Sequence, residues 1–127
     1  MEYATLLVML ALLQYAYFVG RTGYMRGKHG IKAPATTGHE MFERAYRVQQ
    51  NTLEELIIFV PATFTYAAWT SSFWVVLPGG LFLLGRLLYG MAYMKDPKKR
   101  GPGFGLTMMA NTWLIIGTLV SLASALI

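Results

Sequence analysis

The chain has 127 residues, of which 55% are hydrophobic and only 13% are charged. Soluble domains carry about 25% charged residues, so this composition excludes an ordinary soluble domain and favours a small membrane protein. The net charge of +5 gathers in two short regions, which is typical of membrane topology and gives no reason to expect a nucleic-acid partner. Because cysteine is absent, disulfides and thiolate metal sites are excluded.

Four apolar segments are each close to the roughly 20 residues that a membrane-spanning helix needs. We predict helices at residues 3–20, 42–69, 78–95 and 104–126, in one domain covering residues 1–127. The first segment starts with Glu2 rather than a basic residue, and no small-residue cleavage site follows it, so we interpret it as a helix and not as a signal peptide. The predicted fold class is all-α, an integral membrane four-helix bundle.

The stretch between the first two helices is rich in glycine, proline, threonine and charge, which predicts a loop of about two dozen residues. Possible caps at residues 36–40 place the start of the second helix near His39 to Phe42. His29 and His39 have no carboxylates near them at ligand spacing, so we expect solvated loop residues and no metal site.

Most basic residues lie in two loops. One loop joins the first and second predicted helices, and the other joins the third and fourth. The positive-inside rule places both loops in the cytoplasm. The first loop carries Arg21, Arg26, Lys28, Lys32 and Arg44, and the second carries Lys95, Lys98, Lys99 and Arg100. We therefore expect both termini and the middle loop on the opposite side of the membrane.

Three polar residues, Arg47, Asn51 and Glu54, share one face of the second helix. An ionised side chain near the bilayer centre costs roughly 3 kcal/mol, so such residues usually face a polar cavity or the bundle interior. The functional interpretation is a cleft for a zwitterionic ligand. The structural alternative is that Arg47 pairs with Glu54 while Asn51 bonds across helices. Pro61 is expected to kink this helix.

The third helix places Arg86, Tyr89 and Tyr93 on one face, either as ligand donors or as an interfacial tyrosine belt. Arginine matches a carboxylate, glutamate an ammonium group, and asparagine an amide, and glutathione carries all three. Arg100 ends a basic run that serves topology and lipid contact, or else stabilises a thiolate. Residues 101–103 are expected to precede the fourth helix, where Asn111 is expected to form an interhelical hydrogen bond.

The run from Phe42 to Glu54 contains the pattern E-R-x-x-R-x-x-x-N-x-x-E. This pattern closely resembles the signature of the MAPEG family, the membrane-associated proteins in eicosanoid and glutathione metabolism. The sequence Pro34-Ala35-Thr36-Thr37-Gly38 upstream, and the downstream positions of Arg86, Tyr89, Tyr93 and Arg100, are similar to the glutathione-using members. The resemblance covers almost the whole chain.

The resemblance implies a homotrimer that binds glutathione as cosubstrate between neighbouring subunits, near the cytoplasmic face, without a metal. It implies glutathione contacts from Arg47, Asn51, Glu54, Tyr89, Tyr93 and Arg100, with Arg26 and Gln49 reaching the same ligand from the adjacent subunit. Arg100 is the expected catalytic residue, activating the thiol for attack on a lipophilic electrophile that enters from the bilayer. The same site suits reduction of lipid hydroperoxides. The short chain resembles prokaryotic members, so we expect a multi-pass protein of the bacterial inner membrane.

Two positions depart from the family's eicosanoid-forming enzyme. Gly27 stands where that enzyme has a second consecutive arginine, and Glu55 stands where it has tyrosine. A general detoxifying glutathione transferase is therefore the leading hypothesis. The alternatives are a non-catalytic lipid-binding scaffold of the same family, and a small four-helix drug exporter in which Glu54 or Glu55 relays protons.

Overall fold

The computed structural model describes residues 1–127 and contains helices without strands. Four α-helices, α1 (Glu2–Lys28), α2 (Glu40–Trp69), α3 (Val76–Lys95) and α4 (Gly101–Leu126), are joined by short connections. A single 3₁₀ turn, η1 (Pro97–Arg100), links α3 to α4. The predicted all-α, four-helix membrane bundle is confirmed.

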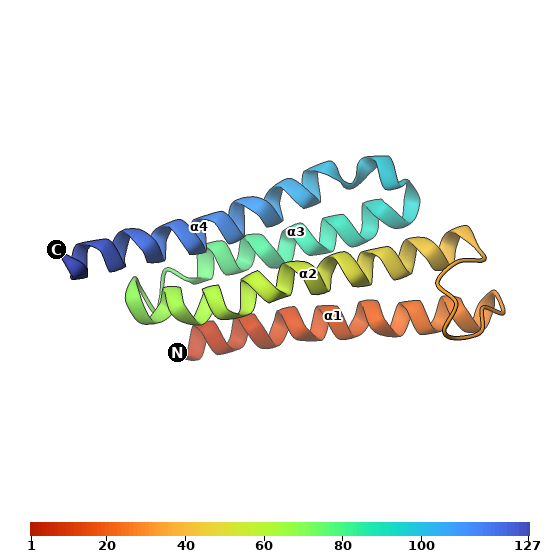
Figure 1. Ribbon diagram of the computed structural model, residues 1–127, viewed down its shortest axis with the longest axis horizontal. Coiled ribbons are helices and arrows are strands. Elements are labelled where there is room, and N and C mark those ends of the chain that lie inside the picture. The colour runs from red at the N-terminus through yellow and green to blue at the C-terminus, as the bar shows by residue number, and fades with distance from the viewer.

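The four helices lie side by side along the long axis of the molecule (Figure 1). The α1–α2 loop and η1 lie at one end, whereas both termini and the α2–α3 connection lie at the other. Three segments are long and apolar enough to cross a membrane: α1, α3, and the continuous stretch Pro97–Leu126. Because α2 joins the end of α1 to the start of α3, it must cross beside them. Its polar half explains why hydropathy alone does not single it out.

The prediction of a long first loop was wrong, because α1 continues to Lys28 and leaves only residues 29–39 as loop. Gly20, Gly23 and Gly27 are helical and have open space around them. The extension is held by tertiary contact: the Thr22 hydroxyl donates to the Ala45 carbonyl of α2 at 3.1 Å. Such contacts override the weak helix propensity of glycine.

Other predicted helix ends need smaller corrections. The second helix, α2, begins at Glu40, two residues before the predicted bound of 42 and within the region His39 to Phe42, with His39 Nδ1 accepting from the Met41 amide at 3.1 Å as the N-terminal cap. The fourth helix begins at Gly101 rather than at residue 104, since Pro102 suits a first helical turn. The third helix begins at Val76 rather than at residue 78. The second helix, α2, remains helical through Pro61.

The α1–α2 loop is closed by its two histidines. The rings of His29 and His39 stack with centroids 3.5 Å apart and planes inclined by 11°, and in addition to this contact His39 is exposed and His29 is partly exposed, in the loop as predicted. Burial lowers the pKa of His29, and the neighbouring His39 and Lys28 lower it further. The neutral form of this ring is therefore favoured in the folded loop.

Stacked aromatic residues and small residues at helix crossings both stabilise the bundle. Phe59 of α2 and Phe82 of α3 are fully buried and stack with ring centroids 3.9 Å apart. Glycines allow closer approach elsewhere: a side chain at Gly103 of α4 would lie 2.7 Å from the Tyr89 Cα and 2.8 Å from the Gly85 carbonyl oxygen of α3. Small residues at helix crossings are the usual means of close packing in membranes.

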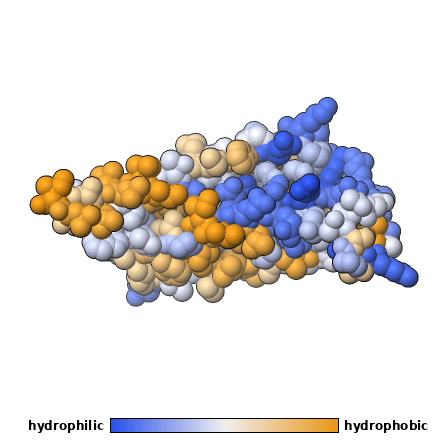
Figure 2. All heavy atoms as spheres, in the orientation of Figure 1, coloured by the Kyte–Doolittle hydropathy of each residue, from blue (hydrophilic) through white to orange (hydrophobic).

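The surface is divided along the long axis. Hydrophilic residues gather toward the end with the α1–α2 loop and η1, while hydrophobic residues cover the end that carries the C-terminus (Figure 2). This asymmetry brings the polar residues of the second and third helices into one half of the bundle.

We expect Gly103→Ala to destabilise the protein by about 1–3 kcal/mol, because the added methyl group meets the α3 backbone, which has no room to retreat. Gly105→Ala is the matched control, since it adds the same group to the same helix where nothing lies within 4 Å. Unfolding in detergent measures both. Equal stability of the two variants would contradict the close contact.

Candidate functional site

A buried arginine lies at the centre of the polar half of the bundle. The Arg86 side chain of α3 has no solvent-exposed surface. Its Nε donates to the Thr107 hydroxyl of α4 at 2.9 Å, and its Nη1 donates to the Thr52 hydroxyl of α2 at 3.4 Å. The guanidinium carbon lies 4.1 Å from the centre of the Tyr89 ring. These contacts join three helices around one positive charge.

A second polar contact lies beside it. Asn111 of α4 donates to Glu55 of α2 at 2.9 Å, which confirms the interhelical hydrogen bond expected of this asparagine. Glu55 also lies close enough to the buried Arg86 for their opposite charges to attract. One donor of Arg86, Nη2, and the amide oxygen of Asn111 are buried without a protein partner. Buried polar atoms without partners point to water or a ligand in the adjoining cavity.

That cavity has a volume of about 430 Å³ and lies among α2, α3 and the start of α4. It contains four of the residues predicted from sequence: Asn51, Glu54, Tyr89 and Arg100. The remaining walls come from Glu55, Arg86, Gly101 and Phe104. Asn51 donates through Nδ2 to the Tyr89 hydroxyl, so the amide and the phenol act as one unit across α2 and α3. We call this space the inner cavity.

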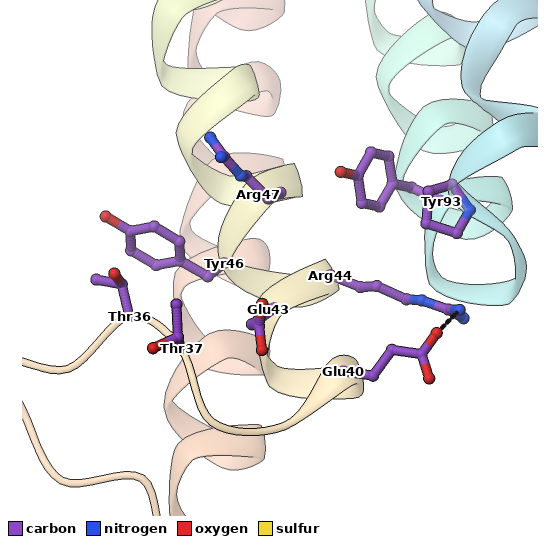
Figure 3. A pocket seen from close by; sticks show the side chains of 9 residues that line it. Thr36, Thr37, Glu40, Glu43, Arg44, Tyr46, Arg47 and Tyr93 are labelled. Atoms are coloured by element: carbon purple, nitrogen blue, oxygen red, sulfur yellow. Dashed lines mark hydrogen bonds and ion pairs between the residues drawn. The ribbon is translucent and has the colours of Figure 1, made fainter.

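A second cavity of about 620 Å³ lies closer to the loop end. It contains the predicted residues Arg47 and Tyr93, which lie on opposite sides with the Tyr93 hydroxyl directed toward α2 (Figure 3). Thr36 and Thr37 approach from the α1–α2 loop. The rings of Tyr89 and Tyr93 are 5.5 Å apart, so consecutive turns of α3 link this outer cavity to the inner one.

The outer cavity is braced by Arg44. This side chain forms an ion pair with Glu40 on its own helix, drawn as a dashed line in Figure 3. It also donates to the Met94 and Lys95 carbonyls at 2.9 and 3.0 Å, at the end of α3. A cation at a helix C-terminus is favoured by the helix dipole. Arg44 thereby fixes the separation of α2 and α3 at the mouth.

Arg47 and Glu54 have no ion-pair partner within the chain. The ion pairs of the protein join Met1 to Glu2 and Arg44 to Glu40, so the structural alternative in which Arg47 neutralises Glu54 does not hold. Both side chains are exposed on the surface of α2. Arg100 is exposed as well, with a hydrogen bond to the Pro97 carbonyl at 3.1 Å. Charged groups of both signs thus remain available to a ligand.

Two predicted residues lie outside both cavities. Arg26 of α1 donates to the Ala35 carbonyl at 2.8 Å and lies 4.7 Å from the Phe42 ring centre. Gln49 of α2 is half-buried and lines neither cavity. A single chain therefore brings together six of the eight predicted residues in two adjoining cavities and leaves these two apart.

Sequence reasoning missed Phe104 and underrated Glu55 and Arg86 as parts of the inner cavity. A usable signal was present for two of them. Glu55 and Arg86 are opposite charges within long apolar helices, and such residues usually face one another or a cavity. Phe104 carries no comparable signal, because an aromatic residue near a membrane interface is common.

Comparison with known proteins identifies the lineage of this bundle. The model of the MAPEG family matches residues 3–120. The chain belongs to the MAPEG family. It is 39% identical to an uncharacterised protein of Synechocystis over 92% of this chain and 85% of that one. It is 33% identical to mouse microsomal glutathione S-transferase 2 over 91% of this chain and 79% of that one. Guinea pig leukotriene C4 synthase is 32% identical over 72% of this chain and 61% of its own length.

The resemblance seen in the sequence is confirmed, and the MAPEG match leaves the drug exporter without support.

We expect Thr107→Val to destabilise the protein by about 1–3 kcal/mol, because the buried Arg86 Nε would lose its acceptor. Thr118→Val is the matched control on the same helix, since the Thr118 hydroxyl bonds only to the Leu114 carbonyl of its own helix, at 2.7 Å. Detergent unfolding with circular dichroism measures the difference. If both variants lose the same stability, Arg86 does not depend on Thr107.

Proposed function

We propose that this MAPEG protein is a glutathione transferase that joins the glutathione thiol to lipophilic electrophiles. The observation that carries the proposal is the inner cavity, where an amide, a phenol, an unpaired carboxylate and an arginine surround one space. Glutathione offers two carboxylates, one ammonium group, two amides and a thiol as complements to these groups. The volumes of the two cavities fall in the usual range for small-molecule sites, about 300–1,000 Å³.

The reactive group is the thiol, and we assign its activation to Arg100. Arg100 and Gly101 line the inner cavity at the start of α4, where the helix dipole also favours an anion. A guanidinium and a helix N-terminus both lower the pKa of a nearby thiol. The thiol proton passes to solvent, and the thiolate then forms a carbon–sulfur bond while the leaving group departs with its electron pair.

The rest of the tripeptide is held by the face that runs between the two cavities. Arg47 suits a carboxylate, Glu54 suits the ammonium group, and the Asn51–Tyr89 pair suits a backbone amide. Tyr93 adds a hydroxyl donor on the outer side. Glu55, which accepts a hydrogen bond from Asn111, adds negative charge next to Arg86. The eicosanoid-forming enzyme has a tyrosine at this position.

We infer that the complete site lies between subunits of a homotrimer. Arg47 and Glu54 are exposed on one chain, although unpaired charges within a bilayer are costly. A neighbouring copy would cover them and would bring its own Arg26 and Gln49 to the same ligand, as the family resemblance implies. In this arrangement both polar loops face the cytoplasm of a bacterial cell, where the inner membrane holds the protein.

We expect Arg100→Ala to lower the thiolate absorbance of bound glutathione at neutral pH about tenfold or more, because an opposite charge shifts a pKa by about 1–3 units. Turnover with an aryl halide acceptor should fall by a similar factor, whereas the glutathione Kd from calorimetry should change much less. Lys99→Ala is the control, since it removes the neighbouring charge that lines neither cavity. An unchanged thiolate signal in Arg100→Ala would remove Arg100 from this role.

We expect Glu54→Gln to weaken glutathione binding about tenfold to a hundredfold, since a hydrogen bond to a charged group contributes about 1.5–3 kcal/mol. Glu2→Gln is the control, because Glu2 begins α1, at the end of the bundle that carries both termini (Figure 1). Calorimetry on the purified protein measures both. A complete absence of binding to the unaltered protein at millimolar glutathione would instead favour the non-catalytic scaffold.

A further inference from the structure

A third cavity of about 500 Å³ lies between α1 and α3, away from the face that carries the other two. Its walls are mostly apolar and include Leu10, Leu13, Tyr17, Leu87 and Met91. Two polar side chains, Gln14 and Arg21, are the exceptions. No residue of this groove lines the inner or the outer cavity.

Arg21 has unused hydrogen-bonding capacity at one end of the groove. Its Nε and Nη2 atoms are shielded from solvent and have no partner, and its Nη1 reaches the Gly90 carbonyl only at 3.5 Å. The guanidinium lies against the Phe18 ring, 5.1 Å from its centre, and no carboxylate lies within ion-pair distance. A positive charge on an apolar groove, with unsatisfied donors, calls for an anion as its partner.

The depth of the groove matches one kind of anion. The Thr22–Ala45 hydrogen bond places Arg21 beside the first turns of α2, and α2 begins at the polar end of the bundle (Figures 1 and 2). Leu10 lies eleven residues earlier in α1, about 16 Å toward the opposite end. A helix as long as α1 exceeds the hydrocarbon thickness of about 30 Å. The guanidinium therefore lies near the headgroup level, and the apolar walls descend to the depth of acyl chains.

A second copy of the chain fits the groove less well. Subunits of a closed ring in a membrane share one level, so a partner carboxylate for Arg21 must lie near the height of Ala45. Glu40 and Glu43 are near this height, but Glu40 pairs with Arg44 and Glu43 accepts from the Gly38 amide at 3.2 Å. The unpaired Glu54 lies nine residues past Ala45, about 14 Å deeper. Arg21 also projects about 140° around α1 from Arg26, the residue assigned to the subunit interface.

We propose that this groove binds an anionic phospholipid of the surrounding leaflet, with its phosphate on Arg21 and one acyl chain between α1 and α3. Occupation of the groove holds α1 against α3 from the lipid side. The site is separate from the glutathione site and does not depend on it.

The test uses the protein in nanodiscs that contain equal amounts of phosphatidylglycerol and phosphatidylcholine with identical acyl chains. Native mass spectrometry after release should show phosphatidylglycerol retained in preference to phosphatidylcholine. We expect Arg21→Gln to reduce this preference about tenfold, the size of one charged hydrogen bond, and Arg21→Lys to retain a large part of it. Lys28→Gln is the matched control, because it removes the same charge from the same helix outside the groove.

Leu87→Trp provides a second test that leaves the arginine in place. A larger side chain on this wall fills the groove, so retention of either lipid should fall even though the charge at Arg21 is unchanged. Equal retention of the two phospholipids by the unaltered protein would overturn the proposal. So would an unchanged preference in Arg21→Gln, or a change of oligomeric state in that variant measured by light scattering, since the last result would assign the groove to a second copy.

Discussion

The buried guanidinium of Arg86 is the constraint on which the polar half of the bundle depends. A charge without solvent contact is tolerated only where hydrogen bonds and a favourable field replace water. Arg86 meets this need with hydroxyl acceptors from α2 and α4 and with the face of Tyr89 on its own helix. Three helices must therefore stay at fixed spacing around it, and that spacing defines the walls of the inner cavity.

The spacing of α3 and α4 has a second determinant in the backbone. Gly85 and Gly103 allow the helices to touch, and the tight η1 turn returns the chain directly from one to the other. Arg100 ends that turn, so its position relative to Tyr89 follows from the crossing of the helices. A residue on a flexible loop would not hold such a position. The expected thiolate partner is thus placed by rigid elements at both sides.

Much of this architecture can be predicted from the sequence, because polar residues are energetically costly in a membrane. Arg47, Asn51 and Glu54 are prominent only because they interrupt an apolar helix, and the inner cavity contains two of them with Tyr89 and Arg100. The C-terminal end of α1 could not be predicted, because three glycines and a cluster of basic residues are typical of a loop. The Thr22–Ala45 contact that holds this segment in the helix is known only from the structure. The separation of Arg26 and Gln49 from the cavities of the same chain was expected only from the family resemblance, which brings them to the ligand from the adjacent subunit, because residue spacing alone does not show tertiary packing.

The exposed charged residues of α2 lie where the two substrates of the proposed reaction would meet, the water-soluble glutathione and the lipophilic electrophile. Asn51 and Glu54 lie eleven and fourteen residues into α2 from Glu40, about 16–21 Å from the polar end at 1.5 Å per residue. A polar tripeptide can reach this depth only along the outer cavity, where Arg47 and Tyr93 replace water. Its thiol then lies below the headgroups, at a level where lipophilic electrophiles concentrate. The cost of placing charges in the bilayer is thereby offset by bringing a water-soluble nucleophile to a membrane-soluble partner.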